Sequence, residues 1–405
     1  MRKIRAGLRS ALMSQLPLPD PEALAHSERL AALIRQETLA AGGALPFSRF
    51  MERCLYAPGL GYYSAGSAKF GAAGDFVTAP ELGPLFAGCI AEALAPVLRQ
   101  LGPQAEFLEI GGGSGAFAEV MLKRLLALDA MPSRYAILEP SADLRECQRE
   151  RLGRGLIPPV FDLVEWLDGP PAERWNGVLF ANEVIDALPT PRFCIRRGEV
   201  YEEHVALDGE GRFVRSDRPA DPLLSAAVRH VERYLGVELA EGYRSELLPQ
   251  LPYWIQAVMG GLDSGAMLFV DYGYPRREYY QPQRDEGTLR AFYRHRTHND
   301  LYRWPGLQDL TASVDFTALA EAGTQAGFEL SGYSTQAAFL LGNGLPQRLA
   351  EAEARVDEAR ALRLRNEAKQ LTLPSAMGER FQVMGFARDV EFGAAFLGGD
   401  LSWRL

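Results

Sequence analysis

The chain has 405 residues, of which 47% are hydrophobic and 23% charged, ordinary values for a globular protein with a sizeable buried core. Its net charge of −9 argues against a protein that mainly grips a nucleic acid, and no stretch is long and apolar enough to cross a membrane. The length favours two domains, or one core domain with large additions.

The N-terminal stretch is basic, and no acid comes before Asp20. It can be a mitochondrial presequence or a short basic arm before the first helix, and we favour the arm. Asp20 is a plausible N-cap, Pro21 suits a first helical turn, and Gly42-Gly43 would end the helix. A short helix and a Gly/Tyr loop follow, and the next helix is predicted over residues 83–101.

From residue 106 the pattern alternates between strand and helix. Short apolar runs that end at a turn or an acid predict strands over 106–110, 134–138, 159–163, 178–182 and 266–271. Helical runs follow the first two of these strands. Such alternation implies a parallel sheet with helices on both faces, which is a doubly wound α/β fold.

Two segments interrupt the alternation. Residues 190–261 contain paired turn signals, which predict a small antiparallel excursion followed by two helices. A long aromatic and basic loop follows the fifth strand, and loops of that length are usually functional. The tail predicts a helix, a strand, a charged helix over 347–371 and a last strand. We expect an N-terminal helical and lid segment (1–95), the first half of the core (96–190), the insertion (191–262) and the second half of the core (263–405).

Cysteines and histidines are few and scattered. Cys54, Cys89, Cys147 and Cys194 show no C-x-x-C spacing, which argues against a disulfide framework or a zinc site. Of the histidines only His295 and His298 are close, and they have no acidic or thiol partner at ligand spacing. We therefore expect no metal and a reducing compartment: the bacterial cytoplasm, with the mitochondrial matrix as the alternative.

The loop after the first core strand, within "FLEIGGGSGAFAE", is rich in glycine. Glycines between a strand and a helix let a ligand approach the backbone. Gly111, Gly113 and Ala116 fit the dinucleotide pattern G-x-G-x-x-[G/A], whereas Glu109, Gly111, Gly113 and Gly115 fit E-x-G-x-G-x-G, typical of class I S-adenosylmethionine (SAM) methyltransferases. A carboxylate at Glu109 would repel a pyrophosphate but suits the ammonium and sulfonium of SAM. We favour SAM, and the alternatives are a dinucleotide or a tight strand-to-helix turn that holds no ligand.

The second core strand also ends in an acid. Glu139, in "YAILEP", can accept hydrogen bonds from both ribose hydroxyls, although it could also be a helix cap or a loop acid. After the third predicted strand, Phe161 and Asp162 would lie beside the adenine, and Phe161 could instead be a core residue.

Further polar residues follow the fourth predicted strand. In a doubly wound sheet, ligands bind beyond the carboxyl ends of the strands, which here carry Asn182, Glu183 and Asp186. At the start of a helix, carboxylates three residues apart could face one direction. We assign Asn182 to the cofactor and Glu183 and Asp186 to catalysis. An exposed acidic helix start, favoured by the helix dipole, is the alternative.

Seven motifs occur together in a recognisable order: "GYYSAG…FGAAGDFVTAPE", "LEIGGGSG", "LEPS", "ANEVIDALP", "VDYGY", "GTLRAFYRHR" and "DLTASVDF". With them the chain, from about residue 46 onward, resembles the MidA-like family of SAM-dependent methyltransferases. The resemblance implies a class I core with extra segments. For mitochondrial members it implies complex I assembly and symmetric dimethylation of an arginine in a complex I subunit. The chain departs from the family at Ala79, where a serine is usual, and at Pro84, where a helix would begin.

The stretch "GDFVTAPE" is predicted to be a lid over the SAM site. Flexible glycines would let it move and Phe76 would cover the site and exclude water; an ordinary surface loop is the alternative. The lid residues are Gly74, Asp75, Phe76, Thr78, Pro80 and Glu81.

The acceptor predicted from these features is an accessible arginine of a protein substrate. A guanidinium is delocalised and stays protonated, so methylating it requires carboxylates that localise its charge and accept a proton. Glu183 and Asp186 are the candidates. Methylation of a small molecule or another protein side chain, and a SAM-binding assembly chaperone without turnover, are the alternatives.

Overall fold

The computed structural model describes residues 16–64 and 78–405, which form two compact units. The first unit takes the described part of residues 1–77 with Ala187–Leu248 and Pro282–Ala312, and the second takes Thr78–Asp186, Pro249–Gln281 and Ser313–Leu405. This division differs from the four predicted segments. Residues 78–95 and 249–262 belong to the core unit, and residues 282–312 belong to the other unit.

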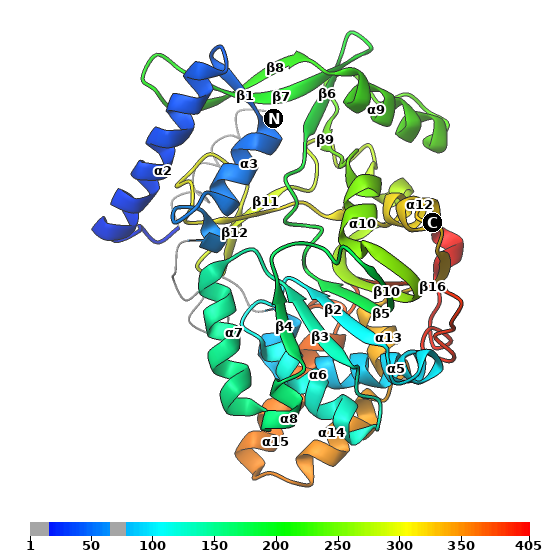
Figure 1. The fold of residues 1–405 in the computed structure, drawn as a ribbon. Helices are drawn as coiled ribbons and strands as arrows, with labels where there is room; N and C mark the ends of the chain where they lie inside the picture. Colours follow the sequence, from blue (N-terminus) through cyan, green and yellow to red (C-terminus); the bar gives the residue numbers. More distant parts are fainter. Residues whose placement is uncertain (1–15, 65–77) are drawn as a thin grey trace. The chain divides into compact units, whose positions relative to one another are not determined.

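An eight-stranded mixed sheet forms the centre of the second unit (Figure 1). Its order is β15-β16-β10-β5-β2-β3-β4, with β14 paired to β10; β10, β5, β2, β3 and β4 are parallel, and β16 is antiparallel to both neighbours. The bounds are β2 Glu106–Ile110, β3 Arg134–Leu138, β4 Val164–Leu167, β5 Arg174–Asn182, β10 Gly261–Tyr274, β14 Val314–Asp315, β15 Glu329–Thr335 and β16 Phe381–Arg388. The predicted Rossmann-like α/β core is confirmed, and β16, which lies between β10 and the edge strand β15, runs opposite to both.

Helices cover both faces of this sheet. On one face, Phe117 of α6 stacks on Phe180 of β5. On the other, α12 places Gly323 against Phe386 of β16, which in turn contacts Phe269 of β10. The helices of this unit are α4 Ala79–Leu82, α5 Leu85–Leu101, α6 Ala116–Ala127, α7 Ala142–Gly155, α8 Pro158–Phe161, α10 Leu251–Met259, α11 Arg276–Tyr279, α12 Phe316–Gln325, α13 Gln336–Gly342, α14 Leu345–Glu353, α15 Glu358–Thr372 and η2 Ser402–Arg404.

The strand order changes direction at β2, which lies between β5 and β3. In open α/β sheets the crevice beyond the carboxyl ends of the strands at such a point is where ligands bind. The strands β2, β3 and β5 end at Ile110, Leu138 and Asn182. The glycine loop, Glu139 and the acidic turn after Asn182 therefore follow three neighbouring strand ends.

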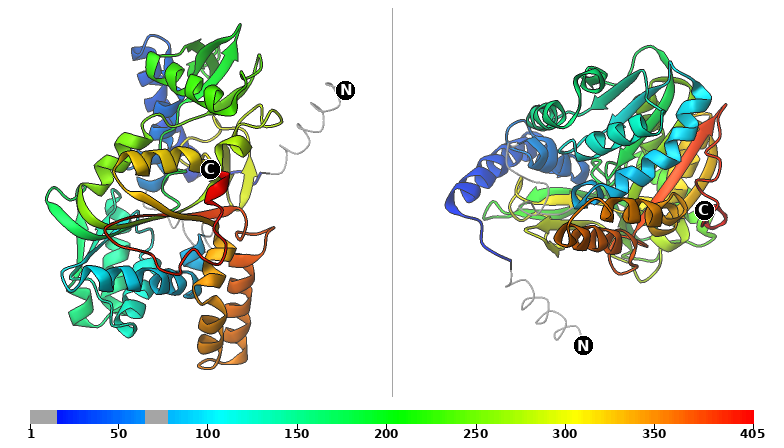
Figure 2. Two further views of the ribbon diagram at one scale, coloured as in Figure 1. Left: turned by 90° about the vertical axis from the view of Figure 1, so that its right-hand side faces the viewer. Right: turned by 90° about the horizontal axis from the view of Figure 1, so that it is seen from below.

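The prediction of a third strand over residues 159–163 is wrong. Residues 158–161 form the short helix α8, because two prolines suit its first turn, and the strand of this region is β4, which begins at Val164. The charged helix predicted over 347–371 is two helices, α14 and α15, which lie side by side (Figure 2). Asp357 begins the second by accepting a hydrogen bond from the Arg360 N–H at 2.8 Å.

The first unit is built on antiparallel pairing. A five-stranded sheet has the order β1-β7-β6-β9 with β8 on β7, and a three-stranded sheet has the order β12-β11-β13. The antiparallel excursion predicted after residue 190 is confirmed, and the long aromatic loop contains the smaller sheet. The bounds are α2 Pro21–Ala40, β1 Ala44–Pro46, α3 Phe47–Tyr56, η1 Tyr62–Ser64, β6 Arg192–Arg196, β7 Glu199–Leu207, β8 Phe213–Pro219, α9 Pro222–Leu235, β9 Arg244–Glu246, β11 Arg290–Tyr293, β12 Arg296–His298 and β13 Asp309–Thr311.

Buried charges in the first unit pair with one another. Glu203 on β7 accepts hydrogen bonds from Arg192 at 2.8 Å and from Arg244 at 2.8 Å. Arg244 also holds both carboxylate oxygens of Asp217, at 2.9 and 2.8 Å. The Tyr302 hydroxyl donates to Glu203 at 2.8 Å. These groups tie β6, β7, β8 and β9 to the segment that carries Tyr302.

Candidate active site

The glycine loop joins β2 to α6 in a conformation that requires glycine. Gly111, Gly113 and Gly115 have φ angles of +71°, +51° and +80°, in the left-handed region that other residues rarely adopt. The Gly111 N–H donates to the Leu138 carbonyl oxygen at 3.0 Å, which ties the loop to the end of β3. At Gly113, a Cβ atom would meet nothing within 4 Å in the described part of the chain. The loop therefore has open space at Gly113.

Glu109 is buried within β2, two residues before this loop. Its Oε2 accepts a hydrogen bond from the Tyr135 hydroxyl of β3 at 2.8 Å. Burial raises the pKa of Glu109 to about 8, the Tyr135 hydrogen bond opposes that rise, and the Glu139 carboxylate adds to it. Glu109 on β2 and Glu139 directly after β3 therefore lie close enough for the charge of one to affect the pKa of the other.

Glu139 follows β3 and is also buried. Its Oε1 accepts from the Ser141 N–H at 3.0 Å, and its Oε2 lies 3.4 Å from the Gln148 amide nitrogen. Burial raises the pKa of Glu139 to about 7, although these hydrogen bonds and the Arg145 charge lower it. Arg145 reaches the Glu139 backbone oxygen at 2.5 Å and the Leu167 backbone oxygen at 2.7 Å. The ends of β3 and β4 are thereby joined beside Glu139.

The turn after β5 is irregular. The predicted helix start at Glu183 and Asp186 was wrong: residues 183–188 form bends and a turn, and Glu183 has a φ angle of +54°. The Asn182 amide donates to the Glu183 carboxylate at 3.1 Å, and the Asn182 Oδ1 atom is buried without a hydrogen-bond partner among the described residues. A Cβ on Gly111 would lie 3.0 Å from Val184 Cγ2, so this turn packs against the glycine loop.

Asp271 on β10 holds this turn and was not among the predicted site residues. Its Oδ2 accepts from the backbone N–H groups of Ile185 at 3.1 Å and Asp186 at 3.2 Å. Burial raises the pKa of Asp271 well above its usual range, and the nearby Asp186 and Glu183 carboxylates raise it further. Three acids thus gather where β5 and β10 end. The sequence signal was "VDYGY", in which an acid ends a buried apolar strand.

Phe161 and Asp162 are not where the sequence placed them. Both precede β4, which is parallel to β3, so they lie at the edge of the sheet opposite the glycine loop. Phe161 packs against Trp166 and the core beneath it, and Asp162 is exposed. At the carboxyl end of β4 the chain offers Asp168, which pairs with Arg145 at 2.6 Å. A correct strand assignment in "LVEWLDG" would have found it.

Half of the predicted lid lies outside the described residues: Gly74, Asp75 and Phe76. The other half, Thr78, Pro80 and Glu81, belongs to the second unit, in which Ala79, the departure from the family pattern, is fully buried. The Ser114 hydroxyl, in the glycine loop, donates a hydrogen bond to the Glu81 carboxylate. This end of the stretch therefore touches the glycine loop directly.

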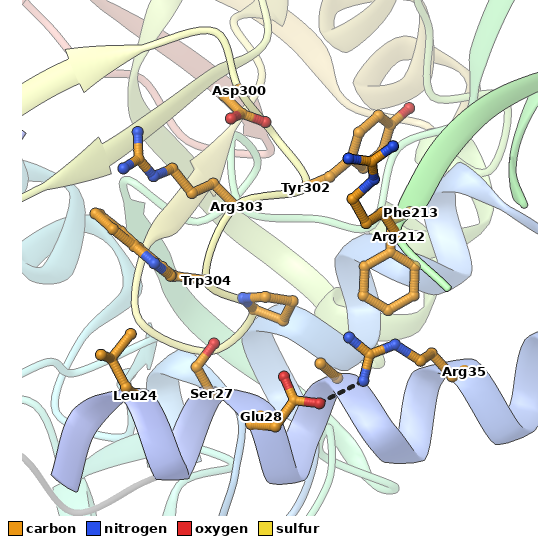
Figure 3. A pocket seen from close by; sticks show the side chains of 12 residues that line it. Leu24, Ser27, Glu28, Arg35, Arg212, Phe213, Asp300, Tyr302, Arg303 and Trp304 are labelled. Carbon is orange, nitrogen blue, oxygen red and sulfur yellow. Dashed lines mark hydrogen bonds and ion pairs between the residues drawn. The ribbon is translucent and has the colours of Figure 1, made fainter. Parts of the chain in front are cut away.

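A hollow of about 350 Å³ lies elsewhere, within the first unit (Figure 3). Helix α2 forms its floor, and Phe213 and Trp304 stand on different sides of it. Arg35 pairs with Glu28 at 2.5 Å, and the Arg303 guanidinium stacks 4.0 Å from the Trp304 ring centroid. None of the predicted site residues that the structure describes lines this hollow.

The residues around the glycine loop suit SAM. The buried acids Glu109 and Glu139 would favour its ammonium and ribose hydroxyls, and the buried Asn182 Oδ1 atom can accept a further hydrogen bond. A dinucleotide would instead place its pyrophosphate beside the Glu109 carboxylate. Fold and site together define a class I SAM-dependent methyltransferase.

Known proteins support this class. A family model described as "Putative S-adenosyl-L-methionine-dependent methyltransferase" matches residues 89–334. A Burkholderia thailandensis protein, described as a "likely methyl transferase" and solved with bound S-adenosyl-homocysteine, is 43% identical, with a TM-score of 0.88 over 96% of this chain and 100% of that one. The chain belongs to the MidA-like family of SAM-dependent methyltransferases, and SAM is its cofactor.

More distant relatives are named for their substrate. The Drosophila melanogaster "Protein arginine methyltransferase NDUFAF7 homolog, mitochondrial" is 28% identical over 95% of this chain and 91% of its own length. The human "Protein arginine methyltransferase NDUFAF7, mitochondrial" is 26% identical over 84% of this chain and 80% of its own length.

The described residues also bear on two other kinds of feature, a membrane span and a metal site. Across residues 16–64 and 78–405, no helix combines the length and apolar character that crossing a membrane requires. Within the same ranges, no three or more His, Cys, Asp or Glu side chains gather as metal ligands would.

Proposed function

We propose that the protein transfers methyl groups from SAM to the guanidinium of arginine in a protein substrate, with symmetric dimethylation as the product. The observation that supports this acceptor is the gathering of three acids at the ends of β5 and β10. Asp271 is buried, and its pKa is raised by burial and then by the carboxylates of Asp186 and Glu183. A cationic acceptor would relieve this repulsion, whereas a neutral one would not. The names of the distant relatives point to the same acceptor.

In this proposal Glu183 binds the guanidinium. A carboxylate can accept two parallel N–H hydrogen bonds from the flat fork of an arginine, which concentrates positive charge on one side of the group and leaves the other nitrogen more nucleophilic. Asp186 assists by accepting a proton or by fixing the turn. Asp271 keeps the turn in place through the Ile185 and Asp186 N–H groups.

We propose that the cofactor lies along the glycine loop, held by Glu109, Gly111, Gly113, Gly115, Glu139 and Asn182. When bound, SAM supplies an electrophilic methyl group on a sulfonium. The residues of the chain have to orient the acceptor nitrogen along the S–C axis, exclude water and receive the proton that leaves nitrogen as the N–C bond forms and the S–C bond breaks. We propose that Thr78, Pro80 and Glu81, the described part of the predicted lid, cover this site from the side of Ser114.

The test is transfer of labelled methyl groups. Lysate from cells that lack the protein is incubated with methyl-labelled SAM, with and without the purified enzyme, and labelled proteins are hydrolysed for amino-acid analysis. The proposal expects labelled symmetric dimethylarginine that depends on the enzyme. Methyl-lysine, or label only in small molecules, would overturn the arginine assignment. SAM binding with no label transfer would instead support a chaperone without turnover.

The setting of this reaction is also proposed. A role in complex I assembly would apply if the acceptor is a respiratory subunit, as the family resemblance implies. For the compartment we retain the bacterial cytoplasm, with the mitochondrial matrix as the alternative, because the named arginine methyltransferase relatives are mitochondrial. Finding the labelled acceptor in a fractionated lysate tests both.

A further inference from the structure

A buried glutamine connects three parts of the candidate cofactor site. Gln148 lies on α7, and its side chain is fully buried. Its Nε2 donates to the Gly113 carbonyl oxygen at 2.8 Å and lies 3.4 Å from Oε2 of Glu139. Its Oε1 accepts from the Trp166 indole N–H at 2.8 Å. One amide thus joins the glycine loop after β2, the acid after β3 and strand β4.

The direction of this amide is determined by chemistry. An indole N–H can only donate, so the atom that faces Trp166 must be the amide oxygen. The NH2 group then has to face the other way, where it meets two acceptors, the Gly113 carbonyl and the Glu139 carboxylate. Only a side chain with an acceptor on one side and a donor on the other satisfies all three groups.

The glycine loop also packs on Gln148. A Cβ on Gly112 would lie 3.0 Å from the Gln148 amide nitrogen, and a Cβ on Gly115 would lie 3.3 Å from the Gln148 Cα. At Gly113, in contrast, the added atom would have no neighbour within 4 Å among residues 16–64 and 78–405. Gly112 and Gly115 therefore leave room for α7, and Gly113 is the glycine that leaves room for a ligand.

We propose that Gln148 is a positioning residue for SAM, which acts by fixing Glu139 relative to the glycine loop. The inference rests on the cofactor site proposed above. With Oε1 of Glu139 held by Ser141 and Oε2 facing Gln148, the carboxylate cannot rotate away, and its remaining lone pairs stay directed toward the ribose hydroxyls. Gln148 itself, being buried, acts through Glu139 and Gly113.

Gln148→Glu is the decisive variant, because it keeps the shape and replaces the amide donor by an acceptor. The introduced carboxylate faces the Glu139 carboxylate and the Gly113 carbonyl. The dissociation constant for S-adenosylhomocysteine, measured by calorimetry, should rise at least about tenfold over wild type at pH 8.5. At pH 6 that ratio should shrink, because a proton shared by the two carboxyls restores the hydrogen bond. Arg145 and Glu109, the other charged groups that act on Glu139, are unchanged in the variant.

Two further variants separate positioning from folding. Gln148→Met keeps the length without the amide and should weaken binding by a ratio that does not shrink at pH 6, because loss of the Gln148 hydrogen bond raises the pKa of Glu139. Cys147→Glu adds a carboxyl to the exposed side of the same helix and should leave affinity unchanged. At saturating SAM, Gln148→Glu should retain most of its kcat, so that the loss appears in KM.

The outcomes are distinguishable. A folded Gln148→Glu protein that binds as tightly as wild type at pH 8.5 would overturn the positioning role. A loss of affinity that is the same at both pH values, and that a smaller folded fraction accounts for, would also overturn the positioning role. If wild type itself fails to bind S-adenosylhomocysteine, the cofactor site proposed above fails first.

Discussion

Both units bury carboxylates, but the cluster around Glu203 in the first unit and the acids around the glycine loop and the β5 turn in the second have opposite neighbours. In the first unit, burial would raise the pKa of Asp217, yet the hydrogen bonds and charge of Arg244, together with Cys194 and Arg196, lower it. In the second unit, burial raises the pKa of Glu109 to about 8 and of Glu139 to about 7, and it raises that of Asp271 well above its usual range. In the described residues, none of these three forms an ion pair with lysine or arginine.

The difference separates structural charge from functional charge. Where the fold supplies its own guanidinium groups, the buried acids are neutralised and tie strands together. Around the glycine loop and the turn after β5, burial and neighbouring carboxylates raise the pKa of the acids instead, and a bound cation would favour their ionised form. SAM and an arginine side chain are both cations, so the second unit has the electrostatics that the proposed reaction needs.

The largest expected effect is on stability, when a charge is removed from the buried ion-pair cluster of Arg192, Glu203, Asp217 and Arg244. Glu203→Gln leaves Arg192 and Arg244 buried beside a neutral side chain, and we expect a loss of about 3–5 kcal/mol in the free energy of unfolding. Urea unfolding followed by circular dichroism measures it. Glu210→Gln, at an exposed ion pair, should change little. Equal stability of the two variants would contradict the structural role of the cluster.

Removing a charge from the three acids Glu183, Asp186 and Asp271 should lower turnover rather than stability. Glu183→Gln keeps the shape of the side chain and should lower kcat by about a hundredfold or more, as for a lost catalytic base. Binding of S-adenosylhomocysteine should be retained, and stability should not fall, because one repulsive charge near Asp271 is gone. Glu150→Gln, on the exposed side of α7, serves as the control. Wild-type turnover in Glu183→Gln would remove this residue from the mechanism.

The cofactor half of the site can be separated from the acceptor half. Glu139→Ala should weaken SAM binding by about 1–3 kcal/mol, the cost of losing hydrogen bonds to a charged group. Titration calorimetry checks this. If the affinity does not change, the ribose must be held elsewhere, with Asp168 at the end of β4 the next residue to substitute.

The smallest expected effect is the dependence of stability and of SAM affinity on pH. Because the pKa values of Glu109 and Glu139 are raised in the folded protein, their contribution to stability is full below about pH 4.5 and is lost as the pH rises through 7 and 8. SAM binding prefers the ionised acids, so the affinity should change in the opposite direction and be about threefold to tenfold higher at pH 8.5 than at pH 6. Glu139→Gln should reduce this dependence. Affinity that is constant over this range would contradict the raised pKa values.

The sequence by itself determined the elements that local chemistry specifies. Strands β2 and β3 were predicted with their observed bounds, because each is a short apolar run that ends at a turn or an acid. The N-cap at Asp20 is confirmed by its hydrogen bond from the Ala23 N–H at 2.8 Å. The glycine loop and Glu109 were enough to choose SAM over a dinucleotide, because the sign of one charge beside the loop decides which ligand is tolerated.

Only the tertiary structure decided which side chains meet. Asp271 reaches the Glu183–Asp186 turn, and Gln148 reaches Glu139 and Gly113, across sequence separations that no local pattern encodes. The helix expected at Glu183 was lost because Asp271 accepts the N–H groups of Ile185 and Asp186 and holds the chain in a turn. The adenine assignment of Phe161 and Asp162 failed because two prolines began a helix where a strand was expected, which moved both residues to the other edge of the sheet. Register and long-range hydrogen bonds are properties of the assembled sheet, and they determined the arrangement of the site.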